Sequence, residues 1–329
     1  MRARWTGAFI DHKYPHFSGF ADNPRRTWNI SLCERLKLDP SKLPRILAPL
    51  NAAMAARCGF RAGVQVVVGC GDTAASFLAC GATREGISVD VAGTASVFTA
   101  TTKRFMADTR RQTLSCAQAA TQGLWHPYAY INGGGLNLEW FRNEIAGGRL
   151  SFDEQDRLAA RIATVEDDLM FVPHLGGRVS PSWPRLGCAW AGLRWSHSTA
   201  HLYQAVREAV ALEYASYRDV LRKLNPSLRL REVRVTGGGE KSALWNRIKA
   251  DALGVHVVQI AGAQGAPMGA PMGVALVAGF GVGLFKDLDA AARAWIKTGG
   301  VTLPERKLAG HYARRLVRYE GLLELLNKW

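Results

Sequence analysis

The chain has 329 residues and a formal net charge of +15, with 42 Lys and Arg residues against 27 Asp and Glu residues. A hydrophobic content of 48% and a charged content of 21% are typical of a globular protein and argue against a disordered or fibrous chain. At this length one large or two smaller hydrophobic cores are expected. The positive charge favours association with anions such as nucleotides, although it does not select among them.

Cysteine spacing and hydrophobicity indicate a reduced, cytoplasmic protein. The six cysteines form no C-x-x-C pair and no zinc-type spacing. Asp11, His12 and Lys13 interrupt the first apolar segment, so no signal peptide is visible. The stretch from 252 to 285 carries no Lys, Arg, Asp or Glu, but prolines and many glycines break it. It fits a buried strand and a buried helix better than a membrane span.

A predicted strand followed by a carboxylate is the first informative pattern along the chain. The valines from 64 to 68 predict a buried strand, and the small residues from 73 to 80 predict a helix. Asp72 lies between these two rigid elements, which is a suitable place for a general base. An equally open interpretation is that Asp72 caps the helix that it precedes.

A hairpin is predicted next. Residues 87 to 91 alternate between apolar and polar side chains, and β-forming residues resume from 96 to 101. Gly93 and Thr94 then form the turn, which offers a hydroxyl and backbone amides to phosphate oxygens. The same residues also suit a plain hairpin turn.

Two glycine runs each separate a predicted strand from a predicted helix. The first, Asn132 to Gly135, precedes a helical pattern from 136 to 145. The second, Gly237 to Gly239, follows the strand pattern of 233 to 235 and precedes a helix with Ser242 at its N-cap. Glycine allows the backbone to approach a ligand closely, and the free amides of a helix start suit a nucleotide or another anion. Tight turns that simply join a strand to a packed helix remain the alternative.

The longest predicted helix runs from 199 to 224 and ends at Asn225-Pro226. Its buried stripe is expected to consist of Leu202, Val206, Ala209, Leu212, Tyr217, Val220, Leu221 and Leu224. His197, His201 and Glu208 near its start fit a surface position better than a metal site. Beyond it, the sequence predicts a strand from 255 to 260, a helix with Pro271 in its first turn, and a C-terminal amphipathic helix.

Several of these motifs, in this order, resemble the FGGY family of carbohydrate kinases, and the resemblance covers about residues 8 to 329. The matching residues are Gly71-Asp72, Gly93-Thr94-Ala95-Ser96, Gly133 to Gly135 with Trp140, Phe171 to Leu175, Arg178, Gly187, Gly192-Leu193, His201-Leu202, Ala205, Glu208, and the Gly237 to Gly239 run followed by x-Ser-x-x-Trp. Arg207 departs from the family's pattern.

The resemblance implies an α/β actin-like ATPase (ribonuclease H-like) fold and a kinase that uses ATP and Mg²⁺. Asp72 would accept the proton of the sugar or polyol hydroxyl as it attacks the γ-phosphate, and Gly93 and Thr94 would contact the phosphates. The residues that would line the ATP pocket are Gly134, Gly135, Gly238, Gly239 and Ser242.

Family members begin with an Asp-x-Gly-Thr-type phosphate motif, and none occurs in this sequence. We therefore expect residues 1–90 to be the remnant of a first, sugar-binding lobe that carries the base, and 91–329 to be a complete ATP-binding lobe. The chain would be a kinase truncated at its N-terminus. The alternative is an inactive nucleotide-binding or partner-binding remnant, completed by a missing-lobe partner or present as a homo-oligomer. No module interleaves basic and aromatic residues, so nucleic-acid binding is not expected.

Overall fold

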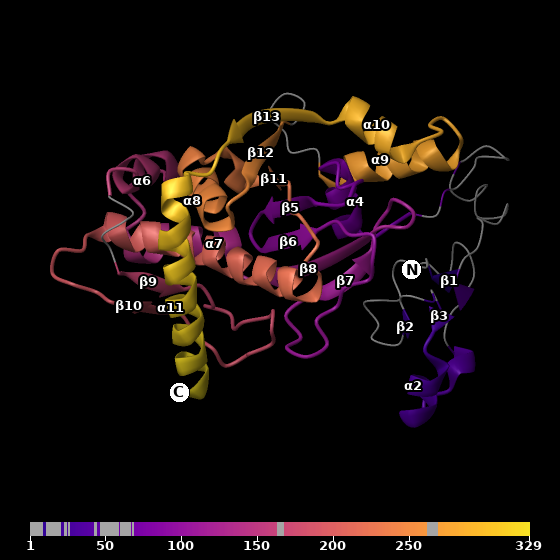
Figure 1. Ribbon diagram of the computed structural model, residues 1–329, viewed down its shortest axis with the longest axis horizontal. Helices are drawn as coiled ribbons and strands as arrows, with labels where there is room; N and C mark the ends of the chain where they lie inside the picture. The colour runs from indigo at the N-terminus through magenta and orange to yellow at the C-terminus, as the bar shows by residue number, and fades with distance from the viewer. Residues whose placement is uncertain are drawn as a thin grey trace. The chain divides into compact units, whose positions relative to one another are not determined.

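The computed structural model describes residues 9–10, 21–22, 25, 27–42, 45–46, 59, 67, 69–162, 168–261 and 269–329 (Figure 1). The chain divides into two compact units. The smaller unit comprises Met1–Thr83, Ala117–Trp125 and Met268–Ile296, and the larger comprises Arg84–Cys116, His126–Pro267 and Lys297–Trp329. The chain thus passes between the units five times, after residues 83, 116, 125, 267 and 296.

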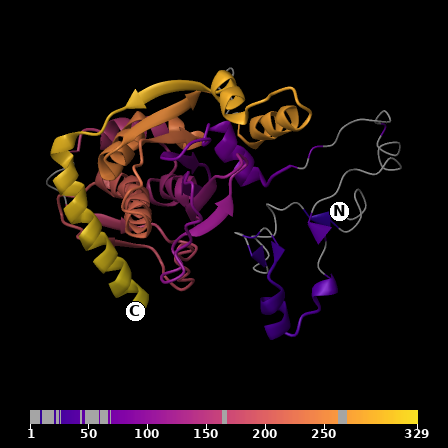
Figure 2. The ribbon, with the colours of Figure 1, turned by 45° about the vertical axis from the view of Figure 1, so that its right-hand side comes forward.

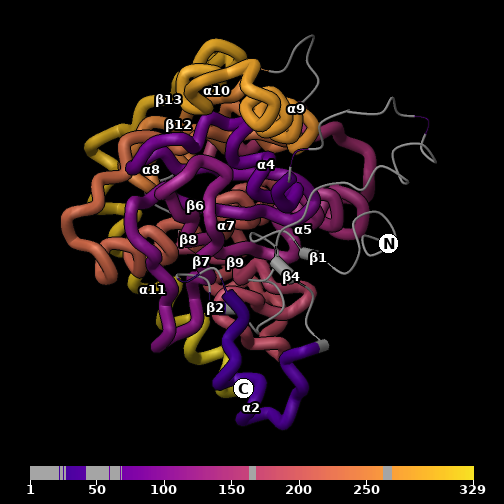
Figure 3. Tube along the Cα trace, turned by 90° about the vertical axis from the view of Figure 1, so that its right-hand side faces the viewer, coloured from indigo at the N-terminus to yellow at the C-terminus, as the bar shows by residue number. Residues whose placement is uncertain are grey.

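Two closely packed helices form the described core of the smaller unit. Helix α4 (Asp72–Ala79) packs against α9 (Ala270–Gly281), and Figure 3 shows them side by side although they are far apart in the sequence. A Cβ atom at Gly273 would lie 1.9 Å from the Ala75 carbonyl oxygen, so this contact requires glycine. Leu288 of α10 (Leu288–Trp295) completes the apolar cluster.

The described residues that precede α4 form only short elements. They are β1 (Phe9–Ile10) paired with β4 (Arg45–Ile46), β2 (Ala21–Asp22) paired with β3 (Thr27–Trp28), helix α2 (Ile30–Arg35) and a 3-10 turn (Pro40–Lys42). The strand predicted from 64 to 68 lies outside the described residues, apart from Val67.

A seven-stranded sheet, whose strands belong mainly to the larger unit, has the order β13-β12-β11-β5-β6-β8-β7. The strands are β5 (Ile87–Ala92), β6 (Ser96–Ala100), β7 (Ser115–Gln118), β8 (Trp125–Ile131), β11 (Glu232–Thr236), β12 (His256–Ala261) and β13 (Lys297–Thr302). β5, β6 and β8 pair antiparallel in succession, which confirms the predicted hairpin, whereas β5, β11 and β12 are parallel.

Parallel neighbours require crossover connections, and two helices provide them. Helix α7 (Thr199–Leu224) precedes β11, and α8 (Ala243–Leu253) joins β11 to β12. The bounds of α7 confirm the prediction for this segment. Figures 1 and 2 show α7 beside the sheet, and Figure 1 shows α11 (Ala309–Lys328) crossing α7, against which it packs.

The other elements of the larger unit cover α7 or cap the sheet. They are α5 (Gly134–Trp140), a π-helix (Phe141–Ile145), α6 (Phe152–Ala159), β9 (Met170–Val172), β10 (Ala189–Ala191), and 3-10 turns at Gly238–Lys241 and Arg306–Leu308. Helices α5, α6, α8 and α11 and strand β9 all pack against α7. The Phe98 and Tyr214 rings stack 5.0 Å apart and join the sheet to α7.

The middle of helix α7 is buried on all sides, whereas the sequence predicted one buried stripe. Every residue from Tyr203 to Tyr217 is buried, because neighbouring elements surround the helix. The charged residues of this buried stretch, Arg207, Glu208 and Glu213, are therefore paired inside the protein. The Arg315 Nη2 atom, for example, lies 2.5 Å from Glu208 Oε2. The interpretation of Glu208 as a surface residue was wrong.

Glu213 of α7 is the most deeply enclosed of these charges. Its carboxylate lies 3.1 Å from Arg178 Nη2 and 3.3 Å from His174 Nε2, and the Tyr319 hydroxyl donates to it at 2.8 Å. Burial alone would raise the pKa of Glu213. The Arg178 and His174 charges, with hydrogen bonds, outweigh that effect and hold the pKa at about 2.

The depressed pKa of Glu213 predicts a specific loss of stability in acid. Its ordinary pKa of 4.5 applies in the unfolded chain, so the unfolded state binds more protons as the pH falls from 4.5 towards about 2. Above pH 4.5 the ion pair contributes about 3 kcal/mol, and this contribution is expected to disappear across that window. Urea unfolding at several pH values measures it; a free energy of unfolding that stays constant from pH 5 to 2.5 would contradict the assignment.

Among the described residues, no helix combines the length and apolar character that crossing a bilayer demands.

Candidate functional site

Three strands of the sheet end at one edge, and each leads into a glycine segment. β8 and β11 both run in the same direction as β5, as the pairing registers show. The carboxyl ends therefore meet, which is where ligands bind in sheets of this kind. The segments that follow are Gly93-Thr94 after β5, Asn132 to Gly135 after β8, and Gly237 to Gly239 after β11.

Backbone contacts hold these segments together. The Gly135 amide donates to the Gly93 carbonyl at 2.9 Å, and a Cβ atom at Gly135 would lie 2.6 Å from that oxygen. Gly237 has a φ of +91°, and a Cβ atom there would lie 2.8 Å from the Ala92 carbonyl oxygen. Glycine is thus required at both positions for close packing, and at Gly237 for its backbone conformation as well.

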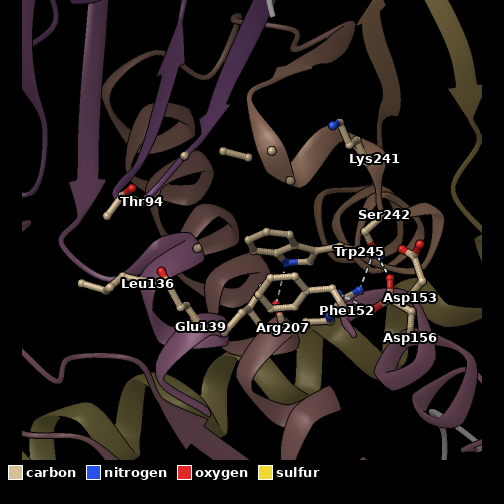
Figure 4. A pocket seen from close by; sticks show the side chains of 16 residues that line it. Thr94, Leu136, Glu139, Phe152, Asp153, Asp156, Arg207, Lys241, Ser242 and Trp245 are labelled. Atoms are coloured by element: carbon tan, nitrogen blue, oxygen red, sulfur yellow. Dashed lines mark hydrogen bonds and ion pairs between the residues drawn. The ribbon is translucent and has the colours of Figure 1, made fainter. Parts of the chain in front are cut away.

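A cavity of about 540 Å³ opens beside the three segments (Figure 4). This volume is within the range of small-molecule sites. Its lining residues are Ala92, Gly93, Thr94, Gly135, Leu136, Leu138, Glu139, Phe152, Asp153, Asp156, Arg207, Gly238, Gly239, Lys241, Ser242 and Trp245. All of them belong to the larger unit.

Most of the predicted pocket residues line this cavity. They are Gly93, Thr94, Gly135, Gly238, Gly239 and Ser242. Gly134 is not among the lining residues. A Cβ atom on Gly134 would lie 1.8 Å from the Ser96 Oγ atom, so this glycine allows α5 to approach strand β6 closely.

Some of the residues that line the cavity have backbone amides without a protein partner. In the part of the chain that the structure describes, the amides of Thr94, Gly238 and Gly239 donate to no protein acceptor. Figure 4 shows Thr94 on one side, Ser242 and Asp153 on the other, and the rings of Trp245 and Phe152 between them. Unpaired amides suit phosphate oxygens, and aromatic rings suit a flat base.

The side of the cavity away from Thr94 contains a hydrogen-bonded cluster. Ser242 caps α8, as predicted, and its Oγ atom accepts from the Trp245 amide at 3.0 Å. The same oxygen accepts from Arg207 Nη1 at 2.5 Å and donates to Asp156 Oδ2 at 2.6 Å. The Arg207 guanidinium also forms an ion pair with Asp156 and donates to the Tyr203 hydroxyl at 2.7 Å.

A second buried ion pair lies beneath Trp245. Lys249 Nζ is 2.5 Å from Asp90 Oδ2 and 4.0 Å from the centroid of the Trp245 ring, and both charged side chains are fully buried. Burial lowers the pKa of Lys249, although the Asp90 charge opposes this shift. The pair fixes α8 to strand β5, and the cation–π contact holds the Trp245 ring.

Asp72 belongs to the smaller unit, where it is the first residue of α4. The N-cap is Gly71, so Asp72 lies inside the helix that it was expected to precede. Its side chain is exposed, and its Oδ1 atom accepts from the Thr73 amide at 2.6 Å. A carboxylate in the first turn also interacts favourably with the helix dipole.

Sequence reasoning missed the residues that α6 brings to the cavity. Phe152 and Asp153 follow Ser151, whose side chain forms a capping box with Glu154. The Ser-x-x-Glu pattern identifies this helix start in the sequence, but nothing local indicates that it faces a cavity. Arg207 stood out only as a departure from a family pattern.

Metal ligands are not preassembled in the described residues: no group of three or more His, Cys, Asp or Glu side chains is placed to hold an ion.

A protein-family model described as the C-terminal domain of the FGGY family of carbohydrate kinases matches residues 89–280. The L-xylulose/3-keto-L-gulonate kinase of Escherichia coli (strain K12) is 27% identical over 300 residues, which are 86% of this chain and 54% of that protein. The chain therefore spans about half the length of this curated relative.

Solved structures match over almost the whole chain. A xylulose kinase from Rhodospirillum rubrum superposes with a TM-score of 0.87 and 27% identity, over 99% of this chain and 66% of that one. A gluconate kinase from Lactobacillus acidophilus gives a TM-score of 0.88 with 19% identity and the same coverage.

Proposed function

Because the chain belongs to the FGGY family of carbohydrate kinases and has the α/β actin-like ATPase fold, we propose that it takes part in ATP-dependent phosphorylation of a sugar or polyol hydroxyl. One observation carries the proposal: three glycine segments from separate strand ends converge on a single cavity. Phosphoryl transfer depends mainly on positioning and charge stabilisation, and such a cavity is suited to both.

In this proposal ATP occupies the cavity with its phosphates near Gly93, Thr94 and Gly238. The unpaired amides there supply donors, while Phe152 and Trp245 supply apolar surface for the base. Mg²⁺ enters with the phosphates and neutralises part of their charge. The sides of the cavity around ATP are supported by Gly134, Gly135, Gly239 and Ser242.

Asp72 is proposed as the general base. Its carboxylate is exposed on a rigid helix start, as a group that accepts a proton from a substrate hydroxyl must be. We assign residues 1–90 to the sugar-binding lobe and 91–329 to the ATP-binding lobe. The acceptor is a sugar or polyol, as the names of the relatives suggest.

A second candidate is nucleotide or partner binding without turnover. Every described residue that lines the cavity belongs to the larger unit, so we expect ATP to bind through that unit. ATP affinity combined with the absence of turnover on a panel of pentoses, ketoses and polyols would favour this candidate.

Replacing Gly238 by alanine tests ATP binding directly. A Cβ atom on Gly238 meets no protein atom within 4 Å, so the fold should tolerate it. Because the methyl group would occupy space beside the cavity, we expect Mg·ATP affinity to fall about tenfold in calorimetry, with no change in melting temperature.

Gly187→Ala is the matched control. A Cβ atom there also meets no atom within 4 Å, and Gly187 is not a lining residue, so wild-type ATP affinity is expected. Equal affinities in Gly238→Ala and the wild type would contradict the proposed phosphate position.

A further inference from the structure

We propose that Arg207 is a positioning residue for the nucleotide base, which it serves by holding helices α6 and α8 at a fixed spacing on one side of the cavity. The inference rests on the proposed function, because it assumes that ATP occupies this cavity. It assigns a role to a residue whose side chain need not touch ATP.

The Ser242 hydroxyl has no hydrogen-bonding capacity left for a ligand. A hydroxyl offers one donor and two acceptor positions. Ser242 Oγ donates to Asp156 Oδ2 and accepts from both Arg207 Nη1 and the Trp245 amide. Ser242 therefore holds α6, α7 and α8 together at this side of the cavity. Any direct contact with a base must come from other lining groups.

Arg207 connects three helices, and the Ser242 hydroxyl is one of its partners. It lies on α7 and is only 2% exposed. Its guanidinium binds Asp156 of α6, Ser242 at the start of α8, and Tyr203 one turn earlier on α7. The Tyr203 hydroxyl in turn donates to Asp156 Oδ1 at 3.1 Å, which closes the network. A planar, forked guanidinium can satisfy these partners together, and a lysine ammonium cannot reproduce that geometry.

The network fixes the groups that would contact a base. Asp156 anchors α6, whose first residues Phe152 and Asp153 line the cavity. The backbone carbonyl of Arg207 accepts from Trp245 Nε1 at 3.1 Å, which sets the orientation of the second ring. Thr94 lies on the other side of the cavity in Figure 4 and takes no part in these contacts. Disturbing Arg207 should therefore affect the base more than the phosphates.

The test compares two ligands, Mg·ATP and Mg·tripolyphosphate, which has no base. In Arg207→Lys we expect ATP affinity to fall about tenfold and tripolyphosphate affinity to change by less than about twofold. A general loss of folded protein would lower both affinities equally. Tyr203→Phe is the milder second variant; it removes one hydroxyl from the network and should lower ATP affinity about threefold with the same selectivity.

Arg315→Lys is the matched control, because Arg315 is a buried arginine paired with Glu208, the residue next to Arg207 on α7. It is expected to reduce stability and leave both affinities unchanged. Wild-type ATP affinity in folded Arg207→Lys and Tyr203→Phe, or equal losses for both ligands, would overturn the inference. If the wild-type protein bound no ATP, the proposed function itself would fail.

Discussion

Replacement of Asp72 by asparagine is expected to lower the rate of phosphoryl transfer about 10²- to 10⁴-fold, the usual contribution of a general base. Asparagine has the same shape and retains an oxygen that can accept from the Thr73 amide, so the start of α4 should remain intact. It cannot take a proton from a hydroxyl. The measurement is ADP release in the presence of individual pentoses, ketoses and polyols.

Two controls separate the role of Asp72 in proton transfer from other effects of the substitution. ATP affinity should be unchanged in Asp72→Asn, because every lining residue of the cavity belongs to the larger unit. Asp287→Asn removes another exposed carboxylate at a helix start in the smaller unit and should leave turnover unaffected. If Asp72→Asn turned over at the wild-type rate, the assignment of the base would be wrong.

Replacement of Glu213 by glutamine is expected to lower the free energy of unfolding by about 3–5 kcal/mol, because it leaves a buried cation without its counter-charge. Arg178 is 5% exposed and has Glu213 as its ion-pair partner. Tyr319 would also lose a charged acceptor. Urea-induced unfolding, followed by far-UV circular dichroism, measures the change.

Glu232→Gln is the surface control for this prediction. Glu232 Oε1 lies 2.7 Å from Arg234 Nε, and both side chains are partly exposed. Solvent screens such a pair, so its removal should cost less than about 1 kcal/mol. If Glu213→Gln also lowered the free energy of unfolding by less than about 1 kcal/mol, the buried ion pair would contribute no more than the surface pair.

Local chemistry was sufficient to predict the glycine segments and the longest helix. Gly93-Thr94 interrupts an alternating pattern, and Gly237 to Gly239 separates a strand pattern from an N-cap at Ser242; both features depend on residues close in sequence. The end of α7 follows from Asn225-Pro226. Since successive parallel strands end at one edge of a sheet, the convergence of the turns was also predictable.

The Arg207 cluster could not be predicted in this way. Asp156, Arg207 and Ser242 come from three separate helices, and a hydrophobic pattern assigns polar residues of this kind to the surface. Arg207 is enclosed because other elements pack around the middle of α7, and this brings it to Asp156 and Ser242. The sequence alone gives no sign that a polar position on a helix will be covered.

Edge strand β13 and the end of α5 were missed for related reasons. β13 contains two adjacent glycines and lacks a strand pattern, and its pairing with β12 defines it. The helix predicted up to residue 145 continues beyond α5 as a π-helix, in which the Ala146 amide donates to the Phe141 carbonyl at 2.9 Å. Packing, and not the local sequence pattern, decides where a helix changes to the i to i+5 hydrogen bonds of a π-helix.

The interleaving of the two units along the chain constrains how the protein is made. Translation delivers β5 to β12 before β13 and α11, and residues 268–296 of the other unit are synthesised in between. During that interval the nascent larger unit has an unpaired β12 edge and lacks the Tyr319 hydroxyl for Glu213. No single protease cut or simple gene truncation can release the larger unit whole; isolating it requires a recombined gene that brings its three segments together.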